Sequence, residues 1–95
     1  MPILKLAGAR SLIRHIVKSG SVALSRHCRD RMIDRNVEMV DVLYALNWGT
    51  VSQGRADSNG DEQIFRVDGR DLEGDPLTIT VKIVNNQTIL CITVF

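Results

Sequence analysis

The chain has 95 residues, of which 44% are hydrophobic and 24% are charged. This length suits one domain with a modest core, so we expect residues 1–95 to form a single domain. The formal net charge is +1, which excludes strong attraction of the whole molecule to nucleic acid. Basic residues dominate from Lys5 to Arg35 and acidic residues gather from Asp57 to Asp75, so any anion must be bound by local clustering near the N-terminal half.

The opening run Met1–Leu6 is too short and too soon interrupted by charge to be a signal peptide. Since no apolar stretch approaches the length that spans a bilayer, we expect a cytoplasmic protein without a membrane partner. Cys28 and Cys91 occur without paired or metal-type spacing. We therefore expect two buried, reduced thiols.

Apolar residues at helical spacing predict a first helix over Ala9–Ser19, ended by Gly20. The short alternating segment Ser21–Leu24 predicts either a brief strand or an extended connector. Ser25 is a typical helix N-cap, since its hydroxyl can accept a hydrogen bond from the first turn. The second helix should end near Asn36, a residue that tolerates the left-handed conformation.

A third helix is predicted from Val37 to Trp48, with Gly49 as its stop. Tyr44 and Trp48 are four residues apart on it, and we expect them to close the core. The alternative for Trp48 is an exposed anchor for a partner, as single tryptophans at helix ends often lie in interfaces.

After the third helix the hydrophobic period changes to two, which predicts strands. The predicted strands are Thr50–Gln53, Glu62–Asp68, Leu77–Val84 and Thr88–Phe95. They are joined by a linker at Gly54–Asp61, a polar connection at Gly69–Pro76 and a tight turn at Asn85-Asn86. The fold class is therefore α+β, with N-terminal helices packed on a C-terminal antiparallel β-sheet of three to five strands. A parallel sheet is not expected, because no crossover helices separate the last strands.

The predicted second helix concentrates potential acid, base and anion-binding chemistry. Side chains three or four apart share a helix face, so His27, Arg31 and Arg35 form one stripe. Cys28 and Met32 form a narrow apolar stripe that would seat the helix on the core. The basic stripe lacks an obvious acidic partner on the same helix.

These residues form a motif, which reads Ser25-x-His27-x-x-x-Arg31-Met32-x-x-Arg35. Together with the later Ile64–Gly69 segment, it resembles a small bacterial domain family of unknown function. That family looks similar to the RelE superfamily of toxin ribonucleases, including the MqsR and BrnT types, and the resemblance spans about Ser11 to Phe95. It implies a compact RelE-like sheet flanked by helices, and metal-independent cleavage of messenger RNA without a cofactor.

Cleaving RNA without a metal requires an acid and a base, together with cations that stabilise the phosphate charge. Our hypothesis assigns His27 as the acid/base group, and Arg31 and Arg66 as phosphate clamps. Arg66 stands where the MqsR type carries a catalytic glutamine. Arg35 and Lys82 are candidate further contacts to RNA phosphates, although Lys82 has an alternative interpretation on a solvated outer face. No metal site is expected.

Each catalytic candidate also has a structural interpretation. His27 could pack at the helix start and donate a hydrogen bond to a backbone carbonyl. Arg31 could pair with Glu62 or Asp68 across the interface between helix and sheet. Arg66 could form a cross-strand pair with a carboxylate.

Two functions follow from the sequence. The first is a toxin-like endoribonuclease that acts on messenger RNA and is neutralised by a cognate antitoxin protein, which the clustering of His27 with arginines favours. The second is a non-catalytic protein- or RNA-binding module with the same fold, which the near-neutral charge favours. A homodimer or an antitoxin helix could cover the apolar closing run Ile89–Phe95.

Overall fold

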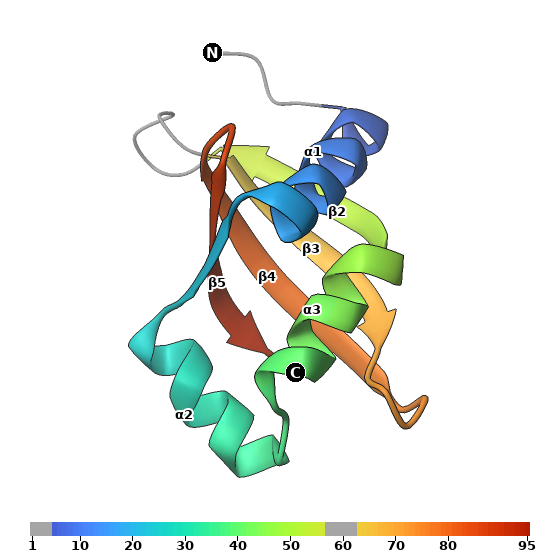
Figure 1. The fold of residues 1–95 in the computed structure, drawn as a ribbon, viewed down its shortest axis with the longest axis vertical. Helices are drawn as coiled ribbons and strands as arrows, with labels where there is room; N and C mark the ends of the chain where they lie inside the picture. The colour runs from blue at the N-terminus through green and yellow to red at the C-terminus, as the bar shows by residue number, and fades with distance from the viewer. Residues whose placement is uncertain (1–4, 57–62) are drawn as a thin grey trace.

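The computed structural model describes residues 5–56 and 63–95, and this part of the chain contains three helices and five strands (Figure 1). The helices are α1 (Leu6–Ser19), α2 (Arg26–Arg35) and α3 (Met39–Trp48). The strands are β1 (Ser21–Leu24), β2 (Thr50–Ala56), β3 (Gln63–Arg70), β4 (Pro76–Asn85) and β5 (Thr88–Val94). The predicted α+β class, with N-terminal helices and a C-terminal sheet, is confirmed.

The five strands form one sheet in the order β1-β5-β4-β3-β2. Strands β2 to β5 are an antiparallel meander, whereas β1 lies parallel to β5, with Ser21 opposite Thr88 and Leu24 opposite Cys91. The sheet is therefore mixed, and the prediction of a purely antiparallel sheet was wrong in this one pair. The connection from β1 to β5 contains α2, α3 and three strands. The parallel pair is therefore joined by this long connection, and not by one helix that crosses directly from strand to strand.

The helices lie on one side of the sheet, and the core lies between the two layers. Figure 1 shows α1 and α3 in front of the sheet and α2 beside the lower end of β5. Along β4, buried and half-exposed residues alternate from Leu77 to Ile83, as expected for strands with one covered face. The buried strand residues that meet the helices are Val51, Phe65, Val67, Leu77, Ile79, Val81, Ile83, Ile89, Cys91 and Val94. Within the described residues, no helix is both long enough and apolar enough to cross a membrane.

The predicted ends of α2 are confirmed. The Ser25 hydroxyl accepts a 3.0 Å hydrogen bond from the amide of Cys28, and it also donates a 2.8 Å hydrogen bond to the carbonyl of Ile92 in β5. Asn36 ends the helix in the left-handed region, with φ 56° and ψ 44°. One serine side chain therefore caps α2 and ties it to the sheet.

Other predicted boundaries differ from the structure by a few residues. Helix α1 already begins at Leu6, and α3 begins at Met39. The turn between β4 and β5 lies at Asn86-Gln87, one residue later than predicted. Strand β2 continues through Ala56 by pairing with β3, so it takes the first three residues of the predicted linker. The rest of that linker, and Glu62, lie outside the described residues.

The prediction that Tyr44 and Trp48 close the core was wrong. The buried side of α3 consists of Val42, Ala45 and Leu46, and this small apolar stripe already fills the space above the sheet. Tyr44 lies on the exposed side, and Trp48 is 66% exposed. The structure therefore agrees with the alternative of an exposed tryptophan.

Helix α3 approaches β3 closely at two glycines. A Cβ atom at Gly69 would lie 2.8 Å from the carbonyl oxygen of Ala45 and 3.0 Å from its Cα. At Gly49 a Cβ would lie 2.8 Å from Cγ1 of Val67. Both distances are shorter than ordinary carbon contacts, so a larger residue would push the helix off the sheet.

Both cysteines are buried and free, as predicted. Burial, and secondarily the neighbouring Cys28, raises the pKa of the Cys91 thiol from 9.0 to about 12. Burial also raises the pKa of Cys28. The two thiols thus belong to the interface between α2 and β5.

We expect Gly69→Ala to lower the free energy of unfolding by about 2 kcal/mol, because the added methyl group overpacks the contact between α3 and β3. Gly8→Ala is the matched control: no atom lies within 4 Å of its added Cβ, and alanine favours the helix by roughly 0.5–1 kcal/mol. Urea unfolding of both variants measures the difference. Equal stability of the two variants would show that the close approach imposes no constraint.

We expect the stability of the protein to fall as pH rises from 9.0 to about 12, because the unfolded state loses the Cys91 proton before the folded state does. The stabilisation is fully present below the unfolded pKa and declines by about 1.4 kcal/mol per pH unit in this window. Thermal melts of the wild type and of Cys91→Val across this range separate this thiol from other titrating groups. A wild type that loses no more stability than Cys91→Val would contradict the assignment.

Candidate functional site

The face of the sheet opposite the helices carries a group of polar and charged side chains, and we call it the open face. It presents the residues that alternate with the buried ones along β3 and β4. In register, Ile64 lies opposite Lys82, Arg66 opposite Thr80, and Asp68 opposite Thr78. Gln53 of β2 and Phe95, which follows β5, border this group.

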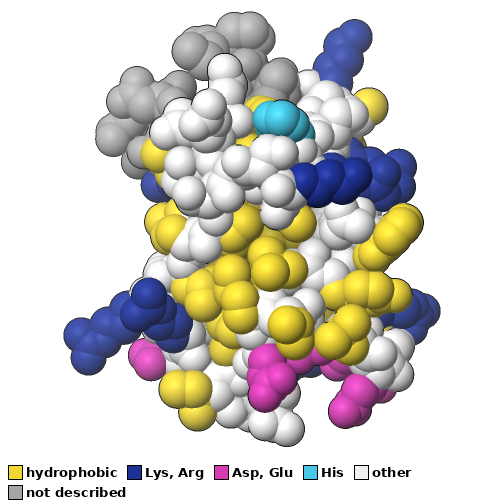
Figure 2. All heavy atoms as spheres, in the orientation of Figure 1, with side chains coloured by type: hydrophobic (Ala, Val, Ile, Leu, Met, Phe, Trp, Pro, Cys, Tyr) yellow, Lys and Arg dark blue, Asp and Glu magenta, His cyan; other side chains and the backbone are white. Residues whose placement is uncertain are grey.

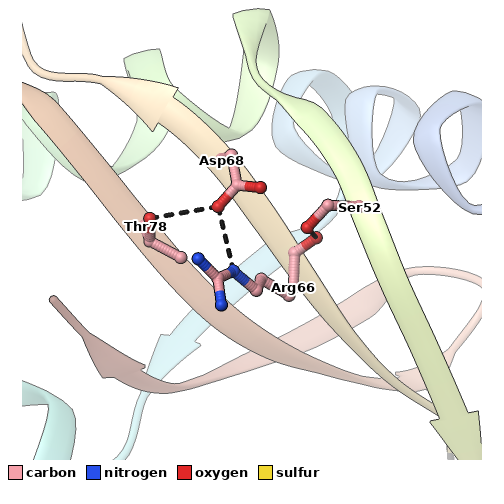
Figure 3. A network of polar contacts seen from close by, with 4 residues as sticks. All are labelled: Ser52, Arg66, Asp68 and Thr78. Carbon is pink, nitrogen blue, oxygen red and sulfur yellow. Dashed lines mark hydrogen bonds and ion pairs between the residues drawn. The ribbon is translucent and has the colours of Figure 1, made fainter.

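Asp68 is the centre of a polar network on the open face (Figure 3). Its Oδ1 atom accepts a 3.0 Å hydrogen bond from Nε of Arg66 and a 3.1 Å hydrogen bond from the hydroxyl of Thr78. The hydroxyl of Ser52 lies alongside and donates a 3.5 Å hydrogen bond to the carbonyl of Arg66. The neighbouring Ser52 hydroxyl does most to lower the pKa of Asp68, burial opposes this effect, and the hydrogen bonds from Arg66 and Thr78 lower the pKa further. Asp68 is therefore a carboxylate at neutral pH.

The ion pair between Arg66 and Asp68 orients the arginine more than it stabilises the fold. Both side chains are 41% exposed, and exposed pairs contribute roughly 0.2–1 kcal/mol. The pair uses Nε, so the terminal guanidinium nitrogens of Arg66 are available to a ligand. The network thus holds a partly exposed cation in a fixed place.

An aromatic ring lies beside this cation. The guanidinium carbon of Arg66 is 5.3 Å from the ring centroid of Phe95, within cation–π distance. Phe95 is itself held by two backbone hydrogen bonds of 2.8 Å with Thr78. Arg66, Phe95, Gln53, Ile64 and Thr80 line a shallow pocket of about 370 Å³.

The structure divides the predicted site residues between two sides of the sheet. Arg66 and Lys82 lie on the open face, at diagonal positions of neighbouring strands. His27, Arg31 and Arg35 lie on α2, and Cys28 and Met32 seat that helix on the opposite face.

The structure therefore places His27 and Arg66 on different layers of the domain and does not bring them together in one site. For the same reason Arg31 does not pair with Asp68. Arg66 does pair with a carboxylate, as its structural interpretation proposed, but the partner is on its own strand rather than across the ladder. His27 is exposed, in contrast to the packed position that its structural interpretation required.

Sequence reasoning missed Ser52, Thr78 and Phe95 as parts of this site. Side chains two apart on a strand share a face, so the sequence alone is enough to group Arg66 with Asp68. The position of Phe95 depends on the register between β4 and β5, which is shifted by an irregularity between Thr80 and Val81. Only the pairing itself shows that Phe95 lies opposite Thr78.

The chemistry available on the open face is the binding of an anion beside a flat apolar group. Arg66 and Lys82 supply positive charge, and Phe95 supplies an aromatic surface. Asp68 is a poor proton donor, because its lowered pKa keeps it ionised. No cluster of three or more metal-ligating side chains occurs within residues 5–56 and 63–95.

We expect the pKa of Asp68 to lie below 3.8 in the wild type and to rise in Thr78→Val, because the variant lacks the hydroxyl that donates a 3.1 Å hydrogen bond to Oδ1 of Asp68. The stabilisation linked to Asp68 is present above its unfolded pKa and is lost as pH falls through its folded pKa. Carboxyl NMR titration measures both values. Asp41, whose pKa is lowered by the backbone amides of Glu38 and Leu72, is the internal control and should not change. An unchanged pKa of Asp68 in Thr78→Val would contradict the network.

Comparison with known proteins identifies a family. No curated protein and no solved structure shows significant similarity to the chain. The family model described as "Domain of unknown function (DUF4258)" matches residues 24–95. This match contains the Ser25–Arg35 motif of α2 and all of β2 to β5. Because it covers well over half of the sequence, the chain belongs to the DUF4258 family.

Proposed function

We propose that this protein is a binding module for single-stranded RNA, that its fold is related to that of the RelE superfamily, and that RNA lies on the open face of the sheet. The observation that carries the proposal is the pairing of an oriented cation, Arg66, with the ring of Phe95 at the rim of a shallow pocket. The relation to RelE-type toxins is supported by the motif in α2 and by the order of helices and strands.

Single-stranded nucleic acid binding combines positive charge, which follows the backbone, with aromatic rings, on which bases stack. On the open face Phe95 supplies the ring, and Arg66 and Lys82 supply the charge. Thr78 and Thr80 supply hydroxyl groups in the same strand as Lys82. The arrangement is therefore suited to a nucleotide whose base contacts Phe95 and whose phosphate contacts a cation.

The alternative, a toxin-like endoribonuclease, receives less support from the geometry. Cleavage needs an acid and a base within reach of the ribose and the leaving oxygen. His27 lies on α2, across the sheet from Arg66, and Asp68 is held as a carboxylate. We therefore propose RNA binding without cleavage, and with it no requirement for a neutralising antitoxin.

We expect Phe95→Ala to weaken binding of a fluorescein-labelled, mixed-sequence single-stranded RNA by about tenfold, because it removes a stacking surface. Lys82→Ala should weaken binding less than Phe95→Ala does. The affinity of the wild type and of both variants for RNA should fall as the salt concentration is raised. Arg35→Ala on α2 is the matched cation control and should bind as the wild type does. Fluorescence anisotropy measures the affinities.

Other outcomes of this experiment identify the alternatives. Loss of binding in Arg35→Ala but not in Phe95→Ala would place RNA on α2 and overturn the proposal. Gel analysis of the same RNA detects cleavage. Cleavage by the wild type that is lost in His27→Ala would establish the endoribonuclease instead.

A further inference from the structure

The exposed side of α3 carries an apolar stripe that the core does not use. Val40, Tyr44 and Trp48 follow one another at intervals of four residues, so they share one face of the helix. All three are exposed, whereas the opposite side of α3 is buried against the sheet. The stripe therefore contributes little to packing inside the domain.

A pocket of about 400 Å³ adjoins the stripe. Tyr44 and Trp48 form one wall, and Arg70 and Pro76 at the ends of β3 and β4 line it from the sheet. The guanidinium of Arg70 donates a 2.8 Å hydrogen bond to the carbonyl of Gly74, so this arginine belongs to the turn between the two strands. The pocket thus offers two aromatic surfaces on a rigid edge of the domain.

Carboxylates border this surface. The amide of Leu72 donates a 3.0 Å hydrogen bond to Asp41, which ties the turn between β3 and β4 to the first turn of α3. The amide of Glu38, and secondarily this bond from Leu72, lower the pKa of Asp41, so it is ionised at neutral pH. Figure 2 shows hydrophobic side chains over α3 and acidic side chains gathered below them. The acidic side chains at this end of α3 and in the adjoining turn are Glu38, Asp41, Asp71, Glu73 and Asp75.

We propose that the stripe Val40-Tyr44-Trp48 and its acidic border bind a basic amphipathic segment of a partner protein. Apolar side chains of the segment would cover the stripe, and its lysines or arginines would face the carboxylates. Exposed tryptophan and tyrosine are the residue types that dominate protein interfaces, and their ring faces also attract cations. The five carboxylates around the stripe outnumber Arg70, the cation in the pocket wall, so the surface favours a basic ligand over the phosphates of nucleic acid. The inference is independent of the RNA-binding proposal, which concerns the open face.

Trp48 is the only tryptophan in the chain, so its fluorescence reports on this surface directly. The probe is a synthetic peptide of leucine and lysine with leucines at helical spacing, and its counterpart with glutamate in place of lysine is the control. We expect the lysine peptide to shift the Trp48 emission to the blue in a saturable manner that weakens at high salt. The glutamate peptide should leave the emission unchanged.

Two test variants, each with a matched control variant, locate the binding. Tyr44→Ala should weaken binding of the lysine peptide by about tenfold, and Ile33→Ala on α2, which is 78% exposed, is the matched apolar control. Glu73→Gln with Asp75→Asn should weaken binding and reduce its salt dependence, whereas Asp30→Asn with Asp34→Asn on α2 should not. Circular dichroism verifies that each variant is folded.

The proposal is overturned if neither peptide shifts the emission, or if both do so equally. It is also overturned if single-stranded RNA shifts the emission more than the lysine peptide does. If the Trp48 emission shifts to the blue as the protein concentration is raised, without any peptide, the stripe instead forms the contact between two copies of this chain.

Discussion

The close approach of α3 to β3 is the constraint that decides which side chains of α3 are buried and which form the exposed stripe. Ala45 packs against the backbone at Gly69, and Gly49 lets the chain pass from α3 into β2 beside Val67. With no Cβ at either glycine, the helix lies low on the sheet and its narrow apolar side is enough to seal the core. The large side chains of α3 are thereby left on the outside.

The same arrangement separates two surfaces of opposite chemistry. On the open face, Arg66 and Lys82 accompany Phe95. At the edge of the sheet, aromatic residues of α3 are bordered by carboxylates. Asp68 lies at the junction, since it orients Arg66 on one side and lines the pocket beside Trp48 on the other. A domain with a net charge of +1 therefore still presents a basic and an acidic surface, because its charges are segregated by face.

Local patterns in the sequence predicted the helices, their caps and most strands, because each of these features depends on neighbouring residues. Ser25 and Asn36 are examples, since a cap acts within one turn of its helix. The strand at Ser21–Leu24 could not be decided, because it exists only through its pairing with β5. The predicted end of β2 was too early for the same reason, because pairing with β3 extends this strand.

The candidate site was harder to predict, because it is assembled by register and by layers. The period of two placed Arg66 with Asp68, yet nothing local indicated that His27 would lie across the sheet from them. The spacing of Tyr44 and Trp48 showed a shared face of the helix without showing which face is buried. The other side of α3 carries small residues such as Ala45. That this side is the buried one becomes clear only from the short distance between Ala45 and β3.

The parallel pair of β1 and β5 has a consequence for how the chain folds. Ser25, at the end of β1, bonds to Ile92, 67 residues later in the sequence. A contact of such separation closes a long loop, so it forms late and at a large cost in chain entropy. The meander of β2 to β5 can form from local hairpins, whereas β1 and the capped start of α2 must wait for β5. Opening from the native state should then begin at the same seam, with β1 and α2 detaching while the meander persists.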